Sequence, residues 1–358
     1  MEKINLGIVG LGAITQMVYL PDLEMLRDKY AVKAVCDASP GVLDAVGSKL
    51  PQASRYLDSK ELCKSGEIDA VLIANSDGFH YADAMEAIKN GKHVFIEKPM
   101  CFTKEEAEDI RAEAKKRGVR AMVGYVRRYS DAYKSARREL EDIKGSLHYV
   151  RIRDILGYNF LFMKENSGLF RFDDIPGEVA KEGARKSAES QAKALGERHA
   201  GREGFYGYLA GLCCHDFSAM RGLLGFPKGI VSAYISNGGS GLYLSVVFDY
   251  GSFAAAYESG IDSQKRRDST LEFFSEKKTV KLEYNCFYYL KQLPDTVTVD
   301  ETVGGEHGRR IVTPSYFCPY ARELEAFYDA VTFGAPIETP PEDYEQDLEL
   351  FKMILDKL

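Results

Sequence analysis

Residues 6–14 read Leu6-Gly7-Ile8-Val9-Gly10-Leu11-Gly12-Ala13-Ile14, a short apolar run followed by a glycine-rich turn. The run predicts a buried strand, and the turn predicts the start of a helix. Gly10 permits a tight turn, and Gly12 lets a pyrophosphate approach backbone N–H groups at the helix N-terminus. A purely structural turn is the alternative. The residues that we interpret as a dinucleotide-binding loop are Gly10, Gly12, Ala13 and Ile14.

The first third of the chain alternates strand-like and helix-like segments. Thr103 and Glu106 have the spacing of a capping box, which predicts a helix that starts there and ends before Gly118. Short strands that alternate with helices predict parallel βαβ units, and therefore an α/β domain with a doubly wound parallel sheet. The predicted strands are 4–9, 32–36, 70–74, 93–96 and 119–123.

Asp37 ends the second apolar run, 22 residues beyond Thr15, which stands in place of the third glycine of the usual fingerprint. A carboxylate at that point accepts hydrogen bonds from both adenosine ribose hydroxyls and repels a 2′-phosphate. The following residues, Ala38-Ser39-Pro40, include no lysine or arginine that could receive that phosphate. The sequence therefore favours NAD over NADP. Asp37 can also begin the turn at Pro40, and the two roles are compatible.

The pattern changes after Gly124, where runs rich in Val, Tyr, Phe and Ser follow one another with few helices between them. This predicts an α+β domain with a large, mostly antiparallel sheet. The expected division is 1–124, a Rossmann domain that binds NAD, and 125–358, a substrate-binding and oligomerisation domain whose C-terminal helices pack back on the first. Residues 176–204 are charged, rich in alanine and interrupted by glycine, which predicts an exposed helical insertion. The predicted strands of this half are 147–154, 229–236, 243–249, 252–258, 270–275 and 279–284, and its last two helices are 321–333 and 342–357.

Composition and charge exclude several classes of protein. A net charge of −7 over 358 residues and a pI near 5.6 argue against a nucleic-acid-binding surface. No apolar run approaches the roughly 20 residues that span a bilayer, and Met1 is followed at once by a strand pattern rather than a signal peptide. The seven cysteines lack metal-ligand spacing, so we expect reduced thiols, no metal site and a cytoplasmic location.

The stretch Gly91-Lys92-His93-Val94-Phe95-Ile96-Glu97-Lys98-Pro99 ends the fourth predicted strand. Together with the glycine-rich opening, it resembles the glucose-fructose oxidoreductase / inositol dehydrogenase / rhizopine catabolism family. The resemblance implies that Lys98 sits beside the nicotinamide and acts on the substrate hydroxyl, and that Glu97 holds the nicotinamide ribose. A surface loop is the alternative interpretation of a Lys-Pro pair standing alone.

Two further segments carry weaker parts of the resemblance. Asn75 and Ser76 stand where the family often has threonine and proline, and an amide at a strand end can still reach ribose or nicotinamide. His80 is a cofactor contact or an ordinary packed histidine. In the linker Gly124-Tyr125-Val126-Arg127-Arg128-Tyr129, we expect Tyr125 to contact substrate and Arg128 to contact cofactor, while Arg127 could belong to an exposed joint between domains.

The segment Leu212–Gly225 resembles a family helix whose N-terminal histidine faces the nicotinamide, and His215 matches that histidine. The family aspartate four residues earlier is Gly211 here, and the later aspartate is Ser218. Adjacent helical residues point about 100° apart, so Asp216 does not simply replace Gly211. At these two positions the sequence departs from the family's standard set of lysine, aspartate and histidine.

Other polar residues are candidates for the substrate pocket. Asp154 ends a strand with alternating apolar positions and could project from its covered face, and Asn159 follows shortly after. Cys213 and Cys214 lie beside His215, but neighbouring side chains diverge, so packed thiols are the better interpretation. The predicted substrate-binding residues are Lys98, Tyr125, Asp154, Asn159 and His215.

Three function classes follow from these residues. The first is an NAD-dependent dehydrogenase that oxidises a secondary hydroxyl of a sugar, cyclitol or polyol, with Lys98 and His215 handling the proton. The second oxidises the ring transiently, so that a glycosidic substituent can be eliminated before re-reduction. The third is a non-enzymatic sensor of dinucleotide or sugar. The resemblance also implies a homodimer or homotetramer built through the open face of the second domain's sheet.

Overall fold

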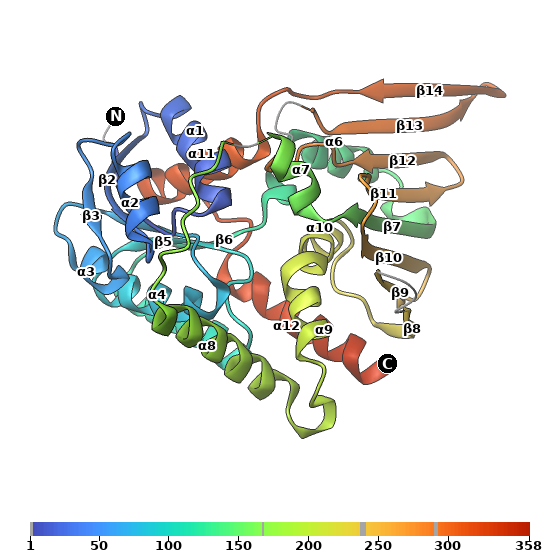
Figure 1. Ribbon diagram of the computed structural model, residues 1–358. Coiled ribbons are helices and arrows are strands. Elements are labelled where there is room, and N and C mark those ends of the chain that lie inside the picture. The colour runs from blue at the N-terminus through green and yellow to red at the C-terminus, as the bar shows by residue number, and fades with distance from the viewer. Residues whose placement is uncertain (1–2, 167, 237–240, 290–292) are drawn as a thin grey trace. The chain divides into compact units, whose positions relative to one another are not determined.

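The computed structural model describes residues 3–166, 168–236, 241–289 and 293–358. Within it the chain forms two compact units (Figure 1). Unit 1 comprises Met1–Tyr125, Gly168–Cys214 and Tyr320–Leu348. Unit 2 comprises Val126–Ser167, His215–Pro319 and Glu349–Leu358. Among the described residues, no helix is both long enough and apolar enough to cross a membrane.

Unit 1 contains a six-stranded sheet with the order β3-β2-β1-β4-β5-β6, in which every described pair is parallel. The predicted doubly wound sheet is therefore confirmed. Because β1 lies between β2 and β4, the strand order reverses at this point, and ligands of such sheets bind outside the carboxyl ends of the strands there. The strands are β1 (Ile4–Val9), β2 (Tyr30–Cys36), β3 (Ser54–Tyr56), β4 (Ala70–Ile73), β5 (His93–Glu97) and β6 (Ala121–Gly124).

The helices of unit 1 follow the predicted signals closely. In α5 the Thr103 hydroxyl accepts from the Glu106 N–H, and the Glu106 carboxylate accepts in return from the Thr103 N–H, which confirms the capping box. Gly118, at φ 69°, ends this helix. The other early helical segments are a π-helical turn (Thr15–Tyr19, η1), α1 (Leu20–Met25), α2 (Pro40–Gly47), α3 (Ser59–Lys64), α4 (Asp77–Lys89) and α5 (Lys104–Arg117).

The segment expected as a helical insertion is mainly α8 (Gly177–Leu195), and it packs on α4. Gly183 of α8 lies so close to the Phe79 ring that an added Cβ would be 2.7 Å from it. Ser190 of α8 donates to the Glu106 carboxylate at 2.8 Å. Residues that complete unit 1 are η4 (Glu197–His199), α9 (Glu203–Tyr208), a second π-helical turn (Leu209–Cys213, η5), α11 (Pro319–Phe333) and the first part of α12 (Pro341–Lys357).

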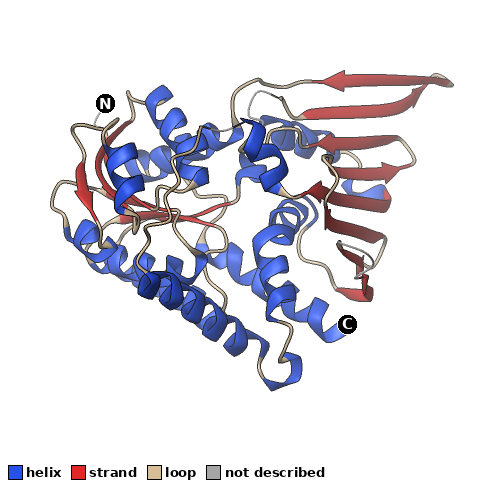
Figure 2. Ribbon diagram, viewed as in Figure 1, coloured by secondary structure: helices blue, strands red, loops and turns tan. Residues whose placement is uncertain are grey.

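Unit 2 is built on an eight-stranded sheet with the order β14-β13-β12-β11-β7-β10-β9-β8. Its strands are drawn in red in Figure 2 and labelled in Figure 1. Among the described strand pairs of this sheet, only that of β7 with β10 is parallel, so the predicted mostly antiparallel sheet is confirmed. The strands are β7 (Leu147–Gly157), β8 (Gly229–Ser236), β9 (Leu242–Asp249), β10 (Ala254–Asp262), β11 (Arg267–Ser275), β12 (Lys278–Glu283), β13 (Thr296–Val303) and β14 (Glu306–Val312). β13 and β14 were not predicted.

Helices cover one face of the unit 2 sheet. The Phe217 ring of α10 (Cys214–Leu224) lies 4.8 Å from the Tyr257 ring of β10 and 5.8 Å from the Phe248 ring of β9, measured between centroids. α6 (Asp131–Leu140) packs on β12 and β13. On β7, Val150, Ile152, Asp154 and Leu156 face this covered side and are buried. The short helix α7 (Asn159–Asn166) follows β7.

Candidate active site

The predicted dinucleotide loop follows β1 at the reversal of strand order. Gly10 has φ +94°, and a Cβ added there would lie 2.5 Å from the Asn75 backbone nitrogen, so only glycine fits. A Cβ at Gly12 would meet nothing within 4 Å, which leaves room for a pyrophosphate beside the backbone. Buried Thr15 takes the place of the third glycine by donating its hydroxyl to the Gly10 carbonyl at 2.6 Å. The loop therefore has the shape that a dinucleotide needs.

Asp37 follows β2 and is only partly buried. Its Oδ2 accepts from the Leu11 N–H of the glycine loop at 2.7 Å, and its Oδ1 accepts from the Ser39 N–H at 2.8 Å. These two bonds fix the carboxylate beside the loop. Each carboxylate oxygen can accept further hydrogen bonds, so the residue can also take the ribose hydroxyls.

Asn75 and Ser76 lie at the carboxyl end of β4, where α4 begins. The Asn75 amide nitrogen donates to Asp83 at 2.7 Å, while its Oδ1 is buried and accepts no hydrogen bond from the described part of the chain. A buried acceptor without a donor costs free energy, so this atom is suited to a ligand N–H or O–H. Ser76 is exposed at the N-terminus of α4, and its side chain makes no capping bond.

His80 is a packed histidine between the ends of β4 and β5. It is 1% exposed, with Nδ1 at 2.7 Å from the Pro99 carbonyl and Nε2 at 3.1 Å from the Asn75 carbonyl. Both partners are backbone carbonyls that lie just after the ends of β5 and β4, so the ring links these two strand ends within unit 1.

Glu97 and Lys98 occupy the carboxyl end of β5. Glu97 is 7% exposed and accepts from the buried Tyr19 hydroxyl and from the Lys98 N–H, the latter at 3.0 Å. The Lys98 ammonium is partly exposed and donates to the Gly211 carbonyl at 3.1 Å. Gly211 is the position at which the family resemblance implies an aspartate. In this structure, a backbone carbonyl in the π-helical turn η5 accepts the hydrogen bond from the lysine.

A buried ion cluster in unit 2 was not anticipated from the sequence. Arg127 is 7% exposed, and its guanidinium donates to Asp154 at 2.9 Å and to Asp216. The Tyr257 hydroxyl donates to the other oxygen of Asp216 at 3.1 Å, and the guanidinium lies 5.0 Å from the centroid of the Tyr284 ring. The interpretation of Arg127 as an exposed joint is therefore wrong. One sequence signal could have indicated the cluster. Arg127 directly follows a predicted buried strand and its turn, and Asp154 and Asp216 both stand among apolar residues.

Burial and charge act together in this cluster. Burial raises the pKa of Asp216 well above its usual range, with neighbouring Asp154 adding to the rise and Arg127 opposing it. Burial alone would lower the pKa of Arg127, but Asp154 and Asp216 outweigh it and raise that pKa. The guanidinium is therefore charged, and it ties the first turn of α10 to β7. His215 directly precedes Asp216 on this turn of α10.

The remaining predicted residues lie in different surroundings. Tyr125 is 1% exposed, and its hydroxyl donates to Asp347 at 2.5 Å within unit 1. Arg128 is buried beside Gly222 of α10, where an added Cβ would be 3.0 Å from its Nε. Asn159 is exposed and accepts from the Tyr289 hydroxyl at 3.3 Å. Asp154 faces the covered side of β7, as expected, but there it is bonded to Arg127.

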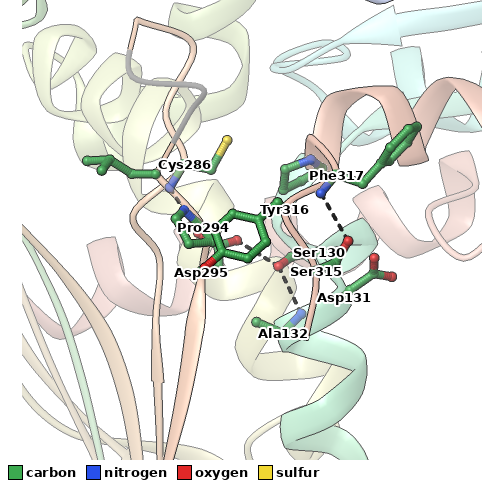
Figure 3. Close-up of a pocket in the computed structure, with 11 residues that line it drawn as sticks. Ser130, Asp131, Ala132, Cys286, Pro294, Asp295, Ser315, Tyr316 and Phe317 are labelled. Carbon is green, nitrogen blue, oxygen red and sulfur yellow. Dashed lines mark hydrogen bonds between the residues drawn. The ribbon is translucent and has the colours of Figure 1, made fainter. Parts of the chain in front are cut away.

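A small pocket in unit 2 involves none of the predicted residues (Figure 3). Its polar groups satisfy one another, because the Ser130 hydroxyl donates to Asp295 at 2.6 Å and the other Asp295 oxygen accepts from the Asn285 and Cys286 N–H groups at 2.7 and 2.9 Å. Burial raises the pKa of Asp295. These bonds anchor the start of α6 rather than offer donors to a ligand.

Comparison with known proteins gives matches to oxidoreductases. Residues 4–125 match the model of an oxidoreductase family with an NAD-binding Rossmann fold. A scyllo-inositol 2-dehydrogenase (NAD(+)) of Bacillus subtilis is 28% identical over 174 residues, which is 47% of this chain and 50% of that protein. A scyllo-inositol 2-dehydrogenase (NADP(+)) of the same organism is 29% identical over 148 residues, 40% of each chain. The chain thus matches half or less of the length of these curated relatives.

Solved structures resemble the whole chain. An oxidoreductase from Thermotoga maritima has a TM-score of 0.74 at 20% identity and covers 99% of this chain and 97% of that one. An aldose-aldose oxidoreductase from Caulobacter crescentus has a TM-score of 0.72 at 17% identity, with 99% and 97% covered. At these identities the likeness concerns the fold alone.

Proposed function

We propose that this chain is an NAD-dependent dehydrogenase of the glucose-fructose oxidoreductase / inositol dehydrogenase / rhizopine catabolism family, as the family match over residues 4–125 and the inositol dehydrogenase relatives support. The proposed substrate is a sugar, cyclitol or related polyol, oxidised at a secondary hydroxyl. The observation that carries the proposal is Lys98, whose ammonium stands at the carboxyl end of β5 in a domain whose glycine loop has room for a dinucleotide. The inositol dehydrogenases among its relatives support the substrate class.

The residues of unit 1 fit the cofactor. Gly12 leaves open space beside the loop backbone, Asp37 offers two carboxylate oxygens, and the buried Oδ1 of Asn75 can accept a hydrogen bond. When bound, NAD would accept the hydride that leaves the substrate carbon. The other residues that would hold it are Gly10, Ala13, Ile14, Ser76 and Glu97, with Arg128 carried over from the resemblance.

Lys98 has the charge and the freedom to act on a hydroxyl. Its ammonium holds three donors, of which one is given to the Gly211 carbonyl at 3.1 Å. The remaining donors can bind a substrate oxygen and stabilise the negative charge that develops on it as the hydride leaves. Because a neutral carbonyl replaces the family carboxylate, the ammonium keeps its net charge available for that oxygen.

His215 is proposed as the group that takes the hydroxyl proton. It is partly exposed on the first turn of α10, while Asp216 next to it is fully buried and fixed by Arg127 and Tyr257. A neutral imidazole can accept a proton near neutral pH, which suits a general base. Asp216 and Arg127 are positioning residues in this account, because they hold the turn that carries His215.

We also propose a homodimer or homotetramer built through the open face of the unit 2 sheet. Tyr149 and Tyr234 are 40% and 67% exposed in the protomer, and Ile311 is 67% exposed. Large apolar side chains on an open sheet face fit burial in an assembly. A monomeric mass by light scattering at micromolar concentration would contradict this part of the proposal.

The proposed activity is tested by a panel of sugars, sugar acids and inositols with NAD or NADP, followed at the nicotinamide absorbance. Net NADH formation with at least one polyol is the expected result. Release of a sugar fragment without net NADH would replace net oxidation by transient oxidation and elimination, a route that the loss of the aspartate at Gly211 leaves open. Tight NADH binding without turnover of any compound would contradict an enzymatic role.

A further inference from the structure

Residues 168–176 connect α7 to α8 without helix or strand, and we name this segment the strap. It belongs to unit 1 and runs as an extended trace past α2 before it enters α8 (Figure 1). An irregular segment with exposed side chains has little burial of its own to hold it. The strap is nevertheless bonded to the Rossmann domain at two separate places, both beside the proposed cofactor loop.

The first attachment is at the glycine loop. The Gln16 side chain forms a two-way pair with the Phe170 backbone, donating to its carbonyl at 3.1 Å and accepting from its N–H at 3.0 Å. Gln16 also donates to the Leu11 carbonyl at 2.7 Å, and the Lys49 ammonium lies 4.6 Å from the centroid of the Phe170 ring. Specific hydrogen bonds thus hold the strap in one position relative to the glycine loop.

The second attachment is at the turn after Asp37. The Asp174 carboxylate accepts from the Ser39 hydroxyl through one oxygen and from the Gly41 N–H at 2.7 Å through the other. Phe172 and Asp174 lie so close to Gly41 that an added Cβ would be 2.6 Å from the Phe172 ring and 2.8 Å from the carboxylate. The bond from the Ser39 hydroxyl lowers the pKa of Asp174, so the group is charged near neutral pH.

The Ser39 hydroxyl and the Gly41 N–H lie where a dinucleotide-binding domain meets the adenosine ribose. The ribose hydroxyls meet the acid that ends the second strand, and a 2′-phosphate would meet the residues just after that acid. Ser39 and Gly41 are those residues, because Ser39 donates its N–H to Asp37 in the same turn. Their hydroxyl and N–H are the donors that a phosphate would use, and here an anion of the chain itself takes them.

We propose that Asp174 occupies the position of the 2′-phosphate of NADP and makes the strap a determinant of specificity for NAD. This inference rests on the proposed dinucleotide binding. NADP could bind only by displacing Asp174 from Ser39 and Gly41 and by placing its phosphate between two carboxylates, those of Asp37 and Asp174. NAD carries no 2′-phosphate, so the strap can stay in place when NAD binds. The adenosine end of NAD would then lie beside the turn of Ser39 and Gly41 without disturbing it.

The test measures binding rather than turnover, with NADH and NADPH as probes in a fluorescence titration of the full chain at low ionic strength. Asp174→Asn removes the charge and Asp174→Ala removes the side chain's bonds as well. We expect either variant to bind NADPH about tenfold more tightly than wild type, with the gain reduced by added salt. The dissociation constant for NADH should change by less than about threefold, because Asp174 makes no hydrogen bond to Asp37, the acid proposed to bind the adenosine ribose.

Asp173→Asn is the matched control, because it removes the same charge from the neighbouring exposed residue, for which the structure gives no bond to another described residue. An equal gain in NADPH binding in this control would overturn the inference in favour of general charge repulsion. Unchanged NADPH binding in both Asp174 variants would overturn it too, while normal NADH binding would leave the proposed function standing. If wild type bound neither nucleotide, the proposed function itself would fail, and the inference with it.

Discussion

The turn after β2 in unit 1 and the ion cluster of unit 2 both hold carboxylates, but in opposite surroundings. Asp37 is partly exposed and is fixed by two backbone N–H groups, which leave its oxygens able to accept more bonds. Asp154 and Asp216 are fully buried and share one guanidinium, that of Arg127. A carboxylate that accepts only from backbone N–H groups at a strand end can still bind a ligand. A buried carboxylate that is paired with a buried arginine instead connects the helix and the sheet that carry the two groups.

The largest effect is expected where the buried cluster supports a proposed catalytic group. His215→Asn keeps a polar side chain but removes the group that titrates, so kcat should fall by about 10²–10⁴-fold. The limb of the pH–rate profile that belongs to the imidazole should flatten at the same time. His148→Asn is the control, since His148 is 56% exposed on β7. A variant that kept both its rate and its pH limb would remove His215 from the reaction.

The cluster itself is tested by Arg127→Met, which leaves two buried carboxylates without their cation. Removal of one partner from a buried ion pair costs about 3–5 kcal/mol in the free energy of unfolding. Burial has raised the pKa of Asp216, so the folded variant takes up protons more readily than the unfolded chain. The loss should therefore shrink as the pH is lowered from about 8 toward about 5, because protonation removes the unpaired charge.

Urea denaturation measures this loss, and Arg117→Met provides the comparison. Arg117 is the last residue of α5, its side chain is 43% exposed, and it pairs with Glu113 at 2.8 Å. Exposed pairs contribute about 0–1 kcal/mol, so this variant should unfold almost as wild type does. Equal losses in the two variants would mean that the cluster of Arg127 is not the special support that its burial indicates.

The smallest of these effects is expected for the partly exposed carboxylate of Asp37 in the turn after β2. Asp37→Ala removes an acceptor of the adenosine ribose, and losing hydrogen bonds to a charged group costs about 1.5–3 kcal/mol, or roughly ten- to a hundredfold in the NAD dissociation constant. NADP binding should change less, which narrows the difference between the two cofactors. Asp44→Ala on α2, at an 80% exposed side chain, should leave both unchanged. Equal use of NAD and NADP by wild type would contradict our interpretation of Asp37.

Much of the fold could be predicted because its signals are local. The capping box of α5 and the strand and helix alternation of unit 1 are each encoded within a few neighbouring residues. β14 was missed because nearly all of its residues are exposed and many are charged, so it has no alternating apolar face to recognise. An edge strand is defined by its pairing with β13, which no short window of sequence contains.

The parts of the site that escaped prediction depend on residues far apart in the chain. Arg127 meets Asp154 and Asp216, 27 and 89 residues later, so its burial could not be inferred from the linker that contains it. Asp174 meets Ser39 across 135 residues, from a segment without periodicity. Lys98 and the glycine loop could be predicted as candidates because each follows a predicted strand in a segment that resembles the family, and the carboxyl ends of such strands gather at one edge of the sheet.

The most direct test of the central claim is the rate of NADH formation by Lys98→Met, measured at saturating NAD with a polyol that wild type oxidises. The variant keeps much of the aliphatic stem but loses the charge and its bond to the Gly211 carbonyl. If the ammonium stabilises the developing alkoxide, kcat should fall by about 10²–10³-fold or more, while NAD binding and the rate of an exposed control, Lys89→Met, stay near wild type. A Lys98→Met enzyme with near-normal kcat would contradict the account and leave a dinucleotide-binding protein whose chemistry lies elsewhere.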